Sequence, residues 1–157
     1  MRSVIKFGLS IAGLVAACNG VNADTLEFNG TAASTCSLTN PVNGTIELQP
    51  DLMSWATATP ATIVATNTSA GSFALTVTHD TDWATKPTGT PATTFTHLAS
   101  IAGANASASF TTNGAATTAA LAAAGVDNVS VALSASAAGP YRAGPHKAQV
   151  TVTCATP

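Results

Sequence analysis

The chain has 157 residues, of which 46% are hydrophobic, 5% aromatic and only 8% charged, and its formal net charge is −2 at pH 7. This length fits one domain, and the weakly acidic balance provides no basic patch for nucleic acid or for an anionic membrane surface. Such a low charge content predicts a surface of Thr, Ser, Asn and Gly, as in exported β-proteins, and leaves few acids and bases for an enzyme.

The N-terminus has the pattern of an export signal. Arg2 and Lys6 precede an apolar run over 7–17, which is too short to span a bilayer. Two processing sites compete. Cleavage after Ala23 would discard 1–23 as a signal peptide and leave 24–157 as a single β-sandwich domain. The residues before Cys18, however, resemble a bacterial lipobox, in which Cys18 would be lipidated. Either route predicts a secreted, cell-surface or periplasmic bacterial protein, which would be held at a membrane only through a lipid on Cys18.

Removal of the signal leaves one pair of cysteines, Cys36 and Cys154. In an oxidising compartment such a pair predicts a disulfide. The bridge would enclose nearly the whole domain, which the loop-entropy model values at about 4–5 kcal/mol. Both cysteines end a predicted strand, at 25–36 and at 146–154, and the last strand alternates strictly between apolar and polar residues. Because both lie at C-terminal strand ends, we expect these first and last strands to run parallel, side by side, and to be disulfide-linked.

Further short apolar alternations, separated by turn residues, predict the other strands. We expect strands at 45–49, 61–67, 72–78, 93–101, 107–111 and 128–135. The runs at 61–67 and 72–78 form the best hairpin signal, whereas 52–59 is expected to be irregular. The alanine-rich run 115–124 suits either a short helix or a small-residue loop. The pattern predicts an all-β fold, an immunoglobulin-like antiparallel β-sandwich of about seven strands.

The sequence contains no catalytic motif, and we predict no enzyme activity, no cofactor and no metal site. It lacks a G-x-S-x-G, a P-loop and an H-E-x-x-H. His79, Asp80 and Asp82 form the one cluster of ligand-type residues, but Zn²⁺ or Ca²⁺ would need more ligands. We expect this cluster to be a polar turn and His97 to be a partly buried strand residue.

Beyond the expected signal peptide, three aromatic residues stand outside the expected strands. Trp55 and Trp83 lie in predicted loops, where they either pack on the core or contact a ligand such as a glycan. Tyr141 lies between two A-G-P turns, and we expect its hydroxyl to tie a loop to the sandwich, as a tyrosine corner does.

The terminal strands resemble those of bacterial secreted β-sandwich proteins. The opening T-L-E-F-N-G-T-A-A-S-T-C is similar to the start of chaperone–usher pilins, and the closing G-P-Y-R-A-G-P-H-K-A-Q-V-T-V-T-C resembles the end of spore coat protein U-like proteins, with His146 where an aromatic residue is usual. The resemblance implies a surface-fibre subunit or extracellular structural protein without catalysis. Two departures argue against polymerisation by strand donation: only Asp24 and Thr25 precede Leu26, and the chain supplies its own last strand.

These observations together predict an exported structural or surface protein, a fimbria-like or adhesion-related subunit that associates with itself or with other fibre subunits. The alternative is a soluble carbohydrate- or ligand-binding module that uses Trp55 and Trp83. The two hypotheses differ in whether the protein forms fibres as its concentration rises.

Overall fold

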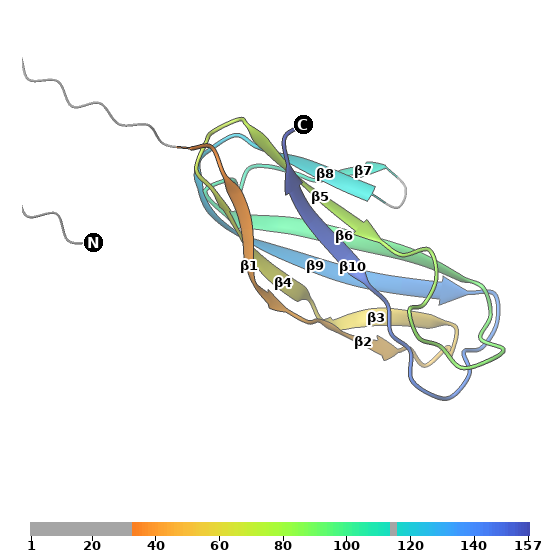
Figure 1. Ribbon diagram of the computed structural model, residues 1–157. Helices are drawn as coiled ribbons and strands as arrows, with labels where there is room; N and C mark the ends of the chain where they lie inside the picture. The colour runs from red at the N-terminus through yellow and green to blue at the C-terminus, as the bar shows by residue number, and fades with distance from the viewer. Residues whose placement is uncertain (1–32, 114–115) are drawn as a thin grey trace, which may run out of the picture. The chain divides into compact units, whose positions relative to one another are not determined.

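Two antiparallel sheets form the structure (Figure 1). The computed structural model describes residues 33–113 and 116–157, and all regular structure in these ranges is β-strand. The strands are β1 (Cys36–Val42), β2 (Thr45–Leu48), β3 (Ser54–Thr59), β4 (Ala61–Asn67), β5 (Phe73–His79), β6 (Thr93–Gly103), β7 (Thr111–Asn113), β8 (Ala116–Leu121), β9 (Gly125–Ala137) and β10 (Val150–Ala155).

The first sheet has the order β1-β4-β9-β3-β2, with β6 paired to the other side of β9, and the second has the order β10-β5-β8-β7. The prediction of an all-β antiparallel fold is therefore confirmed. The expected signal at 1–23, Cys18 and most of the expected strand 25–36 lie outside the described residues. No helix in the described ranges is long and apolar enough to cross a bilayer.

The main hydrophobic core follows from the alternation of apolar residues in β5 and β9. Leu75 and Val77 on β5 and Val129 on β9 are fully buried, and they meet Ala65 and Leu121 between the sheets. The inward faces predicted for these strands are confirmed. Burial of each such aliphatic side chain stabilises the fold by about 1.5–3 kcal/mol, so hydrophobic burial is the main force that holds the two sheets together.

The predicted disulfide is present, but the parallel pairing of the terminal strands is wrong. The Cα atoms of Cys36 and Cys154 lie 6.1 Å apart, across a sequence separation of 118 residues. β1 pairs with β4 and β10 pairs with β5, so the two strands belong to different sheets, and they run in opposite directions in Figure 1. The reason is local: Cys36 begins β1 instead of ending a strand. The disulfide therefore ties one sheet to the other.

The expected hairpin of 61–67 and 72–78 is also absent. β4 lies in the first sheet between β1 and β9, whereas β5 lies in the second between β10 and β8. The five residues between them carry the chain across the sandwich, and the Asn67 side chain accepts a hydrogen bond from the Ser69 N–H at 2.9 Å within this turn. Both strands bury one face, and alternation alone does not distinguish strands that pair from strands that face each other.

Three other segments differ from the sequence prediction. The run 115–124, expected as a helix or loop, contains strand β8, in which Thr117, Ala119 and Leu121 point inward and are buried. Alanines on both faces hide this alternation in the sequence. Residues 54–59, expected to be irregular, form β3, and the strand expected at 107–111 begins only at Thr111 as β7. These additions raise the strand number above the expected seven.

A buried polar network fixes the loops at the disulfide end of the sandwich. Asp127 is fully buried, and its carboxylate accepts hydrogen bonds from the backbone N–H and the side-chain amide of Asn105, both at 2.7 Å. The Asn105 amide also donates to the Ala123 carbonyl at 3.0 Å and accepts from the Ala123 N–H at 2.8 Å. Asn67 donates to the same carbonyl at 3.2 Å. Three interstrand connections are thus joined through side chains whose burial would be costly without these partners.

Candidate functional site

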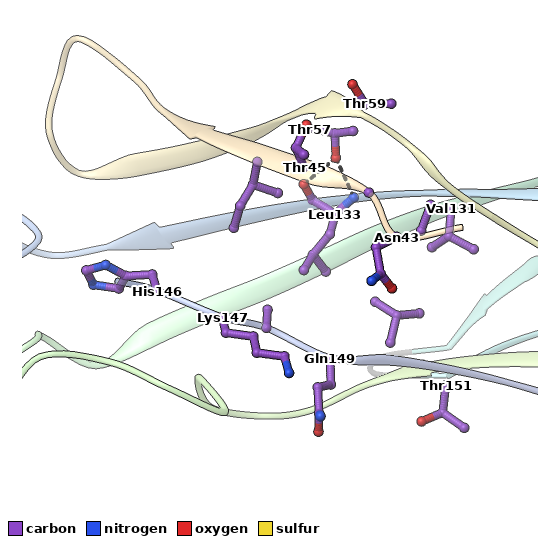
Figure 2. Close-up of a pocket in the computed structure, with 15 residues that line it drawn as sticks. Asn43, Thr45, Thr57, Thr59, Val131, Leu133, His146, Lys147, Gln149 and Thr151 are labelled. Atoms are coloured by element: carbon purple, nitrogen blue, oxygen red, sulfur yellow. Dashed lines mark hydrogen bonds between the residues drawn. The ribbon is translucent and has the colours of Figure 1, made fainter. Parts of the chain in front are cut away.

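The first sheet changes partners halfway along β9. Residues 125–131 of β9 pair with β4, and residues 135–136 pair with β3. Between these stretches, the Thr57 hydroxyl accepts a hydrogen bond from the Leu133 N–H and donates one to the Leu133 carbonyl, both at 2.6 Å (Figure 2). One side chain therefore takes the place of the missing strand backbone, as buried peptide groups require.

The outer strand of the sheet also changes at this point along β9: β1 lies beside β4, and β2 lies beside β3. The chain passes from β1 to β2 at Gly44, where a Cβ atom would lie only 2.6 Å from the Ala61 nitrogen. A residue without a side chain is needed for this close approach of two backbones. We call this place, where β4 and β1 give way to β3 and β2, the strand switch. Gly44 allows the change from β1 to β2, and the Thr57 hydroxyl bridges the change from β4 to β3.

A groove of about 730 Å³ lies beside the strand switch. One wall is the first sheet, and the other is the segment 146–151, which leads into β10. In Figure 2, Asn43 points into the space between these walls, whereas Gln149 and Thr151 point away from it. The apolar residues that line the groove are Ile46, Ala61, Val131, Leu133, Ala148 and Val150.

The groove is lined mainly by apolar and uncharged polar residues. Lys147 and His146 are its titratable residues, and no carboxylate lines it. The two strands that flank it, β2 and β10, are edge strands, each with one partner among the described strands. An edge strand presents backbone N–H and C=O groups to any extended segment that lies beside it. The groove therefore combines an apolar floor with two hydrogen-bonding rims.

A second hydrophobic core lies next to the groove, and it contains both tryptophans. Trp83 is only 6% exposed, and its indole N–H donates to the Thr93 hydroxyl at 2.9 Å. The Trp83 ring meets Phe95 edge-on, with centroids 4.9 Å apart, and Trp55 at 5.8 Å. Trp55, on β3 and not in the expected loop, also lies 5.1 Å from the His146 ring. Such edge-to-face contacts stabilise aromatic clusters beyond simple area burial.

The structure therefore brings Trp55 and Trp83 together but packs them into the interior. Trp83, at 6% exposed, has no free face on which a sugar could stack, and Trp55 is half-buried. The prediction for Tyr141 is wrong: its hydroxyl is buried without a hydrogen-bond partner among the described residues. Tyr141 instead holds its loop through its backbone N–H, which donates to the Leu52 carbonyl at 2.8 Å, and through its buried ring.

The residues of the H-D-T-D sequence separate in the structure. His79 points inward from the end of β5, while Asp80 and Asp82 are exposed. Two hydrogen bonds from Lys86 and one from the Trp83 N–H lower the pKa of Asp82. Within the described ranges, no group of three or more His, Cys, Asp or Glu side chains could hold a metal ion. Asp82 thus caps a polar turn.

The groove itself was not predictable from the alternation of any one strand. Its walls come from four separate segments, near residues 43–46, 57–61, 131–133 and 146–151. The one signal in the sequence is a pair of matching interruptions, Asn43-Gly44 and Pro60, each of which divides a long extended run into two strands. Comparison with protein-family models, curated proteins and solved structures finds no match to this chain.

Proposed function

We propose that this protein is an exported structural subunit of the bacterial cell surface, with an immunoglobulin-like sandwich and no catalytic role. Its partners are further copies of itself or other subunits of a surface fibre. The proposal is supported by an N-terminus with the pattern of an export signal and by a disulfide of the kind that persists in oxidising compartments.

The observation that carries the proposal is the groove between two free strand edges. β2 and β10 flank an apolar floor, and the only charged side chain along it is Lys147. Proteins that stay monomeric usually protect such edges with charged residues, prolines or a covering segment. Here the charged side chains at these edges are few: Glu47 is exposed on β2, and Lys147 lies just before β10. Edges with so little charge beside an apolar groove are suited to association with an extended segment of another subunit.

The test is concentration-dependent assembly of the purified protein. We expect electron microscopy to show fibres, and light scattering to rise, as the concentration increases. Asn43→Lys should raise the concentration needed for assembly, because it places a second positive charge in the groove beside Lys147. Thr39→Lys is the matched control, since Thr39 is also an exposed residue, on β1, and does not line the groove.

Two results would contradict this function. The protein could remain monomeric at every concentration, or the Thr39→Lys and Asn43→Lys variants could assemble alike. A monomer whose tryptophan fluorescence shifts on addition of glycans would instead support the alternative, a carbohydrate-binding module. That result would require Trp55 to carry the contact, because Trp83 is buried.

A further inference from the structure

Two histidines face each other between the sheets. His79 lies at the end of β5 in the second sheet, and His97 lies on β6 in the first. Their Nδ1 atoms are 2.6 Å apart, and the Nε2 atom of His97 is 2.8 Å from the Thr117 hydroxyl on β8. The side chains thus form a continuous hydrogen-bonded chain that joins the two sheets.

This histidine pair lies at the boundary between the two hydrophobic cores. On one side, the His79 ring is 6.2 Å from the ring of Phe95, a residue of the aromatic core. On the other side, Thr117 is 2% exposed and stands next to Ala119 of the main core on β8. A change in the charge or position of either histidine therefore directly affects residues of both cores.

The short distance limits how many protons the pair can hold. Only one hydrogen fits between the two Nδ1 atoms, whichever histidine donates it. If His97 donates Nε2–H to Thr117, His79 donates Nδ1–H to His97. If Thr117 donates to His97 instead, His97 donates Nδ1–H to His79. In both arrangements the pair accommodates one positive charge, but a second would bring two N–H groups head to head.

Among the residues that the structure describes, no buried acidic group lies beside the pair to compensate a second charge. β6 and β8 carry no carboxylate, and β10 carries none. Asp80, which follows His79, is exposed, and Lys147, before β10, is positive. The carboxylate of Asp127 on β9 is hydrogen-bonded to Asn105 at the opposite end of the sandwich. Burial, and then the proximity of His79, lower the pKa of His97.

We propose that His79 and His97 form an acid-sensitive latch between the sheets, which is closed while the pair carries at most one positive charge and opens when both imidazoles are charged. Opening separates β5 from β6 at the aromatic end, while the Cys36–Cys154 disulfide keeps the two sheets joined at the other end. This regulatory device is independent of the function proposed above.

The direction of the pH effect follows from proton counting. The unfolded chain binds two protons at these positions once the pH falls below about 6.5, whereas the closed latch binds one at most. Stability is therefore complete above this pH and falls as the pH drops toward the lowered pKa of His97. A difference of one proton lowers the folding equilibrium constant by about tenfold per pH unit, or at most about thirtyfold between pH 7.5 and 5.

The first experiment is an NMR titration of the imidazoles in the unmodified protein, which requires no variant to fold. We expect His97 to become charged at a lower pH than an ordinary imidazole, together with a change in the signals of Phe95 and Trp83. A slowly exchanging proton shared by the two Nδ1 atoms should be visible above pH 7 and lost in acid. Charging of both His79 and His97 near pH 6.5, with no change in the neighbouring signals, would overturn the proposal.

The second experiment measures urea unfolding between pH 7.5 and 5 in variants. His97→Gln should remove most of the pH dependence, because glutamine preserves a hydrogen bond to Thr117 but cannot be charged. His79→Gln should act in the same direction. His146→Gln is the control, and it should keep the pH dependence of the unmodified protein. If His97→Gln and His146→Gln show the same slope of stability against pH, the latch does not exist.

Discussion

The two ends of the sandwich are both well packed, but they are held by different means. At the disulfide end, Cys36 is bonded to Cys154, and Asp127 and Asn105 connect three loops through buried hydrogen bonds. At the aromatic end, β9 has passed from β4 to β3, and the second sheet does not continue over it. Loop residues such as Trp83 and Tyr141 cover it instead.

The two ends bury their side chains to a similar extent, but we expect them to differ in how easily they open locally. Trp83 and Tyr141 are almost as buried as the main core, yet they lie on connections whose backbone makes few strand hydrogen bonds. Local opening occurs where loops and not strands cover a core. The histidine pair stands between the two ends, and we therefore expect acid to loosen the aromatic end first.

The largest expected effect comes from removing the covalent link at the disulfide end. The double variant Cys36→Ala/Cys154→Ala should lose up to about 4–5 kcal/mol of unfolding free energy in a urea titration, because the unfolded chain is no longer closed into a loop. A reducing agent should lower the Tm of the unmodified protein and leave that of the variant unchanged. If reduction does not alter the Tm of the unmodified protein, the disulfide is not what holds this end together.

A smaller effect is expected from the buried carboxylate. Asp127→Asn should lower the unfolding free energy by about 2–3 kcal/mol, because an amide group in place of one oxygen would face the Asn105 amide, donor against donor. Asp80→Asn, at an exposed position, is the control and should change stability little. Equal stabilities for the two variants in urea would mean that the network does not distinguish this end of the sandwich.

The smallest effect, of the opposite sign, is expected at the aromatic end. The Tyr141 hydroxyl is buried without a partner among the described residues, so Tyr141→Phe should leave stability unchanged or raise it by up to about 1 kcal/mol. Thermal and urea unfolding of this variant can be compared directly with Asp127→Asn. A clear loss of stability in Tyr141→Phe would show that both ends depend on buried polar contacts, and the contrast between them would fail.

Part of this architecture could be predicted because it is local. The alternation in 72–78 and 128–135 identified Leu75, Val77, Val129 and Val131 as core residues, and all four are buried. The number of cysteines, together with the expectation of export, was enough to predict the disulfide. The error about parallel strands came from the boundary at Cys36, because the residues on both sides of it show the same extended pattern in the sequence.

The candidate site depended on contacts that no single segment contains. The Thr57 hydroxyl replaces a strand only because Leu133, far away in the chain, lies where the pairing of β9 with β4 stops and its pairing with β3 starts. His79 and His97 meet only because β5 and β6 belong to different sheets. The sequence around each histidine predicts a half-buried strand, but it does not indicate that the two histidines face each other.

The sequence by itself determined the inward faces and core residues of β5 and β9 and the pair of cysteines, because side-chain period and redox chemistry are properties of the chain. Tertiary structure alone decided which strands pair, where the groove opens and which imidazole faces which. The alternation of a strand determines which of its faces is buried. The strand or sheet that packs against that face is determined by the packing of the whole sandwich.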